Sequence, residues 1–218
     1  MLRKPLPVLA ALLISLAGAA QARGIDVDKV NGSIHIEGNQ QAGNLETVNG
    51  SIRVEDGGSA EDISTVNGSI RLGERATATS LETVNGGAEL GADARINGSV
   101  ETVNGSIVLG QRAEVTGRVE NVNGRIALDA ARVGEGIVTV GGDIEIGADS
   151  HVAGGLRVDK PSGWFNWSDR KPRIVIGPRA VVDGPLEFRR EVELYVSDSA
   201  RIGTVSGATA QKFSGDHP

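Results

Sequence analysis

A Val-Asn-Gly tripeptide that returns at nearly constant intervals constrains the fold of this chain more than any other feature. The tripeptide starts at Val30, and its later copies, the last one altered to Val-Gly-Gly, start at Val48, Val66, Val84, Val103, Val122 and Val140. The intervals between these valines are 18, 18, 18, 19, 19 and 18 residues. A repeat of this length is too short for a pair of helices or a propeller blade, and it suits one rung of a β-solenoid.

A second motif lies about half a period from the first. It combines an aliphatic residue and Gly with further aliphatic residues at offsets of six, as in the segment 109–119. The same arrangement begins at Leu90, Ile146 and Ile176. Aliphatic positions six residues apart within a rung of this length indicate a coil with three sides.

Polar and apolar residues alternate around each Val-Asn-Gly copy, which is the periodicity of a strand. We therefore expect Val48, Ile52 and Val54 to face inward, with Thr47 and Asn49 on the other face. A helix is disfavoured, because helices need a period near 3.6 and avoid Gly, of which there are 31. A series of hairpins at Asn-Gly is the other alternative, but no matching second strand pattern accompanies it.

These patterns predict an all-β fold, a single-stranded, three-sided β-helix with about 18–19 residues per rung. They leave its handedness open. Stacking in register brings equivalent asparagines together, where their amides can form a ladder of hydrogen bonds. Whether this ladder points into the core or outward stays open. Its expected members are Asn31, Asn49, Asn67, Asn85, Asn104 and Asn123.

The N-terminal segment 1–22 has the features of a cleaved secretion signal. Arg3 and Lys4 precede an apolar run, and Ala20-Gln21-Ala22 forms a small-residue cleavage site, so we expect the exported chain to begin at Arg23 without stable membrane insertion. The chain contains no Cys, which excludes disulfides. Loss of two of the 22 basic residues, against 28 acidic ones, leaves a net charge of −8. This charge disfavours nucleic acid as a partner.

Behind the signal, the sequence divides into four parts. Solenoid repeats are expected over 23–158, an aromatic insertion loop over 159–173, further rungs over 174–206 and a flexible tail over 207–218. The loop is expected because equivalent residues lie 30 positions apart there, against 18 or 19 elsewhere.

The insertion loop is the best candidate for a specific contact, because inserted loops of solenoids often form the binding face. Its aromatic and basic side chains suit a sugar, a membrane interface or a protein partner. An equally good alternative is that the rings fold back and seal the flank of the solenoid. The candidate residues are Trp164, Phe165, Trp167, Arg170 and Lys171.

No catalytic motif, cofactor motif or metal-binding spacing is recognisable, so we expect no enzyme activity, cofactor or metal. Glu46, Glu82, Glu101 and Glu120 hold equivalent positions in their rungs. Stacked carboxylates are able to hold a divalent cation, but a solvated acidic face is the favoured interpretation.

A column of threonines precedes the repeat valines, with Asn121 in one rung. If these side chains and the asparagines both point outward, they form a flat Thr-x-Asn array of the kind that binds ice; a soluble polar face is the favoured alternative. The threonines are Thr47, Thr65, Thr83, Thr102 and Thr139.

The Val-Asn-Gly-Ser-Ile repeats over 30–126 resemble bacterial adhesin domains of unknown function, which are exported β-solenoids. The segments 109–119 and 176–186 resemble bactofilins, which are polymer-forming cytoskeletal β-helices. These resemblances imply a non-enzymatic structural or adhesin-like protein, periplasmic or at the cell surface, that makes multivalent contacts or self-associates end to end. The alternative is a module that binds cell-wall glycan, peptidoglycan or a surface protein through its Trp loop.

Overall fold

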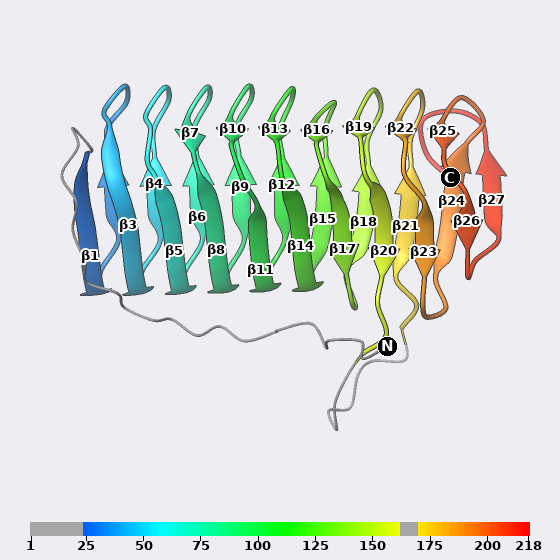
Figure 1. Ribbon diagram of the computed structural model, residues 1–218, viewed down its shortest axis with the longest axis horizontal. Helices are drawn as coiled ribbons and strands as arrows, with labels where there is room; N and C mark the ends of the chain where they lie inside the picture. Colours follow the sequence, from blue (N-terminus) through cyan, green and yellow to red (C-terminus); the bar gives the residue numbers. More distant parts are fainter. Residues whose placement is uncertain (1–23, 162–169) are drawn as a thin grey trace, which may run out of the picture.

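The computed structural model describes residues 24–161 and 170–218. These residues form strands and turns wound into a β-solenoid, so the predicted all-β, three-sided fold is confirmed (Figure 1). Three parallel sheets run along the solenoid, two with ten strands and one with seven. We call them sheets A, B and C. Within the described ranges, no helix has the length and apolar character needed to cross a membrane.

Each rung contributes, in chain order, one strand to sheet A, one to sheet B and, in most rungs, one to sheet C. Sheet A contains β1 (Ile25–Asn31), β3 (Ala42–Asn49), β5 (Asp62–Asn67), β8 (Ser80–Asn85), β11 (Val100–Asn104), β14 (Arg118–Asn123), β17 (Gly136–Thr139), β20 (Gly155–Val158), β23 (Leu186–Phe188) and β26 (Val205–Ser206). Sheet B contains β2 (Ile34–Ile36), β4 (Ile52–Val54), β6 (Ile70–Leu72), β9 (Ala88–Leu90), β12 (Ile107–Leu109), β15 (Arg125–Leu128), β18 (Asp143–Ile146), β21 (Arg173–Ile176), β24 (Glu193–Ser197) and β27 (Ala210–Phe213). Sheet C contains β7 (Thr77–Ala78), β10 (Arg95–Ile96), β13 (Glu114–Val115), β16 (Arg132–Val133), β19 (His151–Val152), β22 (Val181–Val182) and β25 (Arg201–Ile202).

The core consists of continuous columns of aliphatic side chains. One column runs through sheet B and is fully or almost fully buried at every rung from Ile36 to Val196. Small residues such as Ala94 and Ala113 fill the narrow corner before sheet C. Full burial of one such Val, Leu or Ile side chain contributes about 1.5–3 kcal/mol, so repetition along the columns accounts for the stability of a chain with few aromatics.

The corner between sheets A and B brings glycines of successive rungs into close contact. A Cβ on Gly105 would lie 1.8 Å from the carbonyl oxygen of Gly86, and the corresponding clash recurs at Gly50 and Gly68. Only glycine permits this approach. The invariable Gly of the Val-Asn-Gly repeat is therefore explained by contact between rungs.

In most rungs, the turn between sheets B and C contains a residue with positive φ at an equivalent position. Non-glycine residues hold this conformation, including Asp93 and Arg112 with φ of 58° each. Arg112 donates two hydrogen bonds to Asp93, at 2.8 and 2.6 Å, and Arg179 binds Asp149 in the same way. These bonds lower the pKa of both aspartates and link neighbouring turns.

The last rungs differ in detail from the expectation. Equivalent residues of sheet B lie 20 positions apart between Ile176 and Val196, and 16 apart between Val196 and Lys212. The expected tail from residue 207 begins later, because β27 pairs with β24 and completes a further rung. Its contact with β24 extends the solenoid to Phe213.

Candidate functional site

The outer face of sheet A carries the most regular surface of the molecule, and it differs from the sequence-based expectation. Thr47 is 4% exposed and belongs to the interior, whereas Val48 is only partly buried and lies outside. The predicted alternation was wrong here because it was extended through the Asn-Gly-Ser corner. Gly50 and Ser51 separate β3 from β4 and turn the chain, so strict alternation does not continue from Val48 to Ile52.

The buried threonines hold the corner together. The hydroxyl of Thr65 donates to the carbonyl oxygen of Gly50 at 3.0 Å, and Thr83 makes the same bond to Gly68. Thr47 and Thr102 repeat this bond, at 3.2 and 3.0 Å. A flat Thr-x-Asn array on the surface therefore does not exist among these rungs, and the geometry gives no support to ice binding.

The asparagine ladder is formed and points outward. Each amide nitrogen donates to the side-chain oxygen of the preceding rung, over distances of 3.0–3.2 Å. The ladder follows the corner between sheets A and B, where its side chains lie at or near the solvent. It contains Asn31, Asn49, Asn67, Asn85, Asn104 and Asn123, all six residues expected from the sequence.

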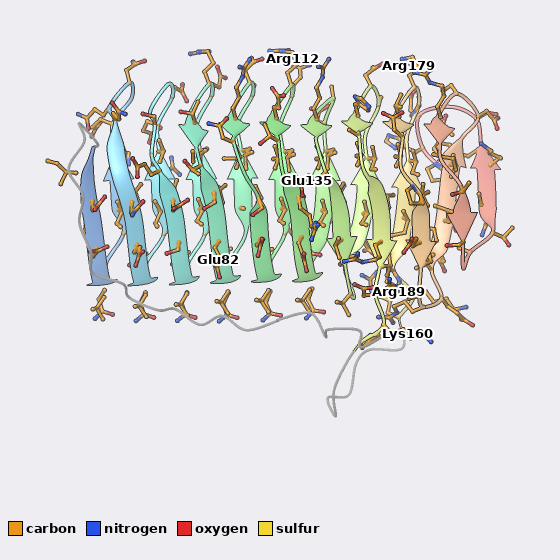
Figure 2. The ribbon with its side chains drawn as sticks, viewed as in Figure 1. Glu82, Arg112, Glu135, Lys160, Arg179 and Arg189 are labelled. Carbon is orange, nitrogen blue, oxygen red and sulfur yellow. The ribbon has the colours of Figure 1, made fainter. Side chains whose placement is uncertain are left out.

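Two further columns lie beside the ladder on the outer face of sheet A. The first is the valine column, which begins at Val30 and consists of the repeat valines Val30, Val48, Val66, Val84, Val103, Val122 and Val140. The second is the acidic column, which consists of Asp28, Glu46, Glu82, Glu101 and Glu120, with Ser64 between the second and third carboxylates. Figure 2 labels Glu82, the member of the acidic column that lies on β8.

The acidic column concentrates negative charge. Adjacent rungs are about 4.8 Å apart, so Glu82, Glu101 and Glu120 are close neighbours. Burial, and then the charge of Glu101, raises the pKa of Glu120. Burial, and then Asp28, raises the pKa of Glu46. The outer face of sheet A therefore presents an apolar valine column beside an acidic column in which neighbouring carboxylates repel one another.

These carboxylates do not converge on one point. Residues 24–161 and 170–218 contain no group of three or more His, Asp or Glu side chains arranged to hold a metal ion. His35 contacts Glu37 and Glu55, and His151 contacts Asp183, each at the surface.

The aromatic part of the insertion loop lies outside the described residues. Trp164, Phe165 and Trp167 belong to this segment, whereas Arg170 and Lys171 are described. Arg170 donates to Asp143 at 2.9 Å, and the ammonium of Lys171 lies 2.9 Å from Glu191. Both basic residues therefore pair with carboxylates at the base of the loop.

The chain enters the loop through a buried carboxylate that the sequence analysis did not single out. Asp159 is 7% exposed and accepts hydrogen bonds from Arg157 at 3.1 Å and Arg189 at 2.8 Å. Arg190 donates to the carbonyl oxygens of Val140 and Arg170. Arg and Asp residues cluster on both sides of the insertion, and this clustering is visible in the sequence. Which Arg pairs with which Asp is not, because Asp159 and Arg189 are 30 residues apart.

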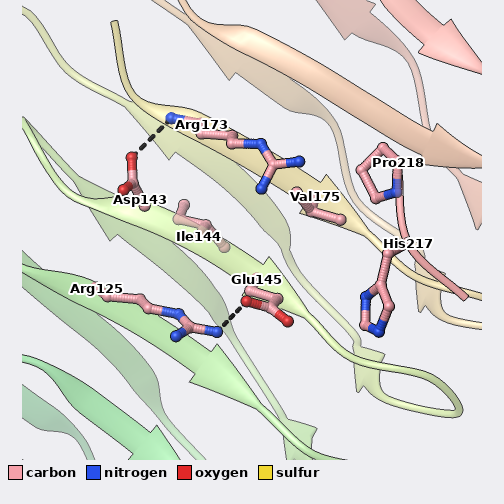
Figure 3. A pocket seen from close by; sticks show the side chains of 8 residues that line it. All are labelled: Arg125, Asp143, Ile144, Glu145, Arg173, Val175, His217 and Pro218. Atoms are coloured by element: carbon pink, nitrogen blue, oxygen red, sulfur yellow. Dashed lines mark hydrogen bonds and ion pairs between the residues drawn. The ribbon is translucent and has the colours of Figure 1, made fainter. Parts of the chain in front are cut away.

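A pocket of about 440 Å³ lies on the outer face of sheet B (Figure 3). Arg125 pairs with Glu145, and the backbone nitrogen of Arg173 donates to Asp143 at 2.8 Å. The terminal residues His217 and Pro218 line the opposite side. Two carboxylates among the described lining residues are thus engaged with neighbouring groups.

Comparison of the sequence with models of known protein families, with curated proteins and with solved structures found no match. The assignment of the chain as a β-solenoid therefore rests on its own strand pairing.

Proposed function

We propose that this protein is an exported, non-enzymatic structural or adhesin-like rod that makes multivalent contacts along the outer face of sheet A. One observation carries the proposal: the valine column and the acidic column run side by side over successive rungs. A partner with a repeating arrangement of apolar and cationic groups gains a contact at each rung. Linked weak contacts of this kind produce high avidity.

The acidic column also defines the chemistry of the proposed partner. Glu82 and Glu46 have no ion-pair partner among the described residues, in contrast to Glu89 and Glu145, which pair with arginines. A cationic partner would relieve the repulsion between the stacked carboxylates. We therefore favour a basic protein of the cell envelope over an acidic polymer. The resemblance of the repeats to exported adhesin domains supports this assignment, as does the expected signal segment 1–22.

The test compares two triple variants in a pull-down with cell-envelope fragments. Glu82→Gln/Glu101→Gln/Glu120→Gln removes the charge of the proposed face while keeping side-chain size. Glu55→Gln/Glu74→Gln/Glu114→Gln removes the same charge from other surfaces. We expect at least a tenfold loss of retention for the first variant and little change for the second. Equal retention of both variants and the unmodified protein would contradict the proposal.

A second candidate function is binding of cell-wall glycan or peptidoglycan through the insertion loop. The supporting observation is that both ends of the loop are anchored, by Asp159 with its two arginines and by Arg170 with Asp143. The described residues on both sides of the aromatic segment are thus held to the solenoid. Retention on purified cell wall distinguishes this candidate: a Trp164→Ala/Trp167→Ala variant should lose it, and the glutamine triple variants should not.

A further inference from the structure

The two ends of the solenoid expose strands that pair on one side only. β1 and β2 begin sheets A and B, and β26 and β27 end them, so these strands have no outer neighbour among the described residues (Figure 1). At the first rung Ile25 is 82% exposed and Val30 is 68% exposed. Such edges are templates for pairing with another chain, and a second copy of the same solenoid is the best-matched partner.

The first rung carries a lysine where later rungs carry the buried threonine. Lys29 is in register with Thr47, which is in register with Thr65, and the column continues inside the solenoid. Lys29 itself is exposed, and its ammonium donates to the carbonyl oxygen of Ser33 at 2.7 Å. In the first described rung, a charged side chain therefore occupies a position that is buried in the later rungs.

The last rung repeats this feature in sheet B. Lys212 of β27 is in register with Val196, the last member of an aliphatic column that begins at Ile36. The column contains Ile36, Val54, Leu72, Leu90, Leu109, Leu128, Ile146, Ile176 and Val196, all buried. Lys212 is exposed, and no described strand pairs with the outer side of β27.

Stacking of a second copy in register would continue these columns across the junction. Val205 of one copy would meet Val27 of the next, and Ala210 would meet Ile34, which are favourable apolar contacts. The same register would place Lys212 against Ile36. It would also place Lys29 against Gly207, which follows the buried Phe188 in the same column. An unpaired ammonium in such a position is strongly unfavourable.

We infer that Lys29 and Lys212 protect the two ends of the solenoid and prevent end-to-end pairing of copies that are otherwise matched. Inward-pointing charges, lysine above all, are a known means of blocking edge strands. The C-terminal tail does not serve this purpose, because it turns back across sheet B, where His217 and Pro218 lie beside Val175 of β21. The rod is therefore a single unit whose contacts are made along its sides.

The test uses the exported full chain and a Lys29→Thr/Lys212→Val variant, which completes both columns with the residues found in neighbouring rungs. We expect single rods for the unmodified protein and filaments at least five rods long for the variant, by electron microscopy and sedimentation. The single variants Lys29→Thr and Lys212→Val each keep one lysine where the last rung of one copy meets the first rung of the next. Each should therefore associate much less than the double variant.

Two controls keep the inference open to contradiction. Lys29→Arg/Lys212→Arg retains both charges and should remain a single rod, and Lys160→Thr removes a lysine from the side of the rod. Circular dichroism establishes that each variant is folded. Filaments of the unmodified protein, filaments of the arginine variant, or a folded double variant that stays monomeric would each overturn the inference. Pull-down through the face of sheet A is a separate result and does not depend on this one.

Discussion

The rungs before and after β17 share the same three sheets but stabilise their corners differently. In most of the earlier rungs, the corner between sheets A and B contains two short hydrogen bonds, one in the asparagine ladder and one from a buried threonine to a glycine carbonyl. After β17 the ladder has ended, and the threonine column continues as Val158 and Phe188. There, side-chain pairs such as Asp159 with Arg189 connect the rungs.

This difference shows which parts of a rung are exchangeable. The interior accepts threonine, valine or phenylalanine in one column, provided that any polar group finds a partner. The corner between sheets A and B tolerates fewer changes of residue and length. Its length determines whether the backbone of one rung lies directly over the backbone of the next. Where the chain lengthens after Val158, the short bonds are replaced by arginine side chains, which can reach over a longer distance.

The largest effect is expected from breaking a corner in the regular rungs. In Gly105→Ala the new Cβ would lie 1.8 Å from the carbonyl oxygen of Gly86, so rungs must move apart. We expect the free energy of unfolding to fall by about 3 kcal/mol, at the upper end of the usual cost of overpacking. Urea denaturation measures this change. Ser106→Ala, in the same corner, is the control, and an equal effect of both variants would contradict the explanation.

The next effect is expected from breaking the corner in the later rungs. Asp159→Ala leaves Arg157 and Arg189 without their shared carboxylate. Because hydrogen bonds to charged groups contribute about 1.5–3 kcal/mol, we expect a loss of about 2 kcal/mol in the free energy of unfolding. Asp129→Ala, at an exposed turn, provides the control. A loss no larger than that of the control would show that the pairs do not stabilise these rungs.

A smaller, opposite effect is expected at the boundary between the two regions. Asn121 replaces threonine in the buried column, and its side-chain oxygen has no hydrogen-bond partner. Its nitrogen lies 3.5 Å from the carbonyl oxygen of Gly105, at the limit for a hydrogen bond. Asn121→Thr should restore the shorter bond of the earlier rungs and raise the free energy of unfolding by about 1 kcal/mol. Asn97→Thr, at an exposed position, should give no such increase in the same denaturation experiment.

The smallest effect concerns the acidic column and depends on pH. Burial and the charge of Glu101 raise the pKa of Glu120 above 4.5, so its ionised form destabilises the folded state at neutral pH. Glu120→Gln should be more stable at pH 7, by less than about 1 kcal/mol. As the pH falls through the folded-state pKa toward 4.5, the folded protein binds the proton first, and the difference should disappear.

Glu191 provides the control for this pH dependence. The hydrogen bond from Lys171, and then its charge, lowers the pKa of Glu191, so its ionised form favours the folded state. Glu191→Gln should therefore not gain stability at neutral pH. A pH-independent difference for Glu120→Gln, measured by thermal unfolding between pH 4 and pH 7, would contradict the proposed repulsion in the column.

The repeat was sufficient to predict the rungs, the three sides and the six-residue asparagine ladder, because identical residues at equal spacing must stack. It was not sufficient to assign the faces at the corner. Strand periodicity alone placed Val48 inside and Thr47 outside, and the structure reverses both. The candidate surface on sheet A follows from that reversal, since the valine column was taken to be part of the core.

The sequence by itself determined that the chain forms stacked rungs, because its short period excludes larger repeating units and its glycines suit corners. Only the tertiary structure decided what each column faces and where the stack ends. That information depends on contacts between rungs, such as the hydrogen bond of Thr65 to Gly50. Lys29 and Lys212 illustrate the reason: each is an ordinary exposed lysine in the sequence, and only the register shows that it stands in a column of the core.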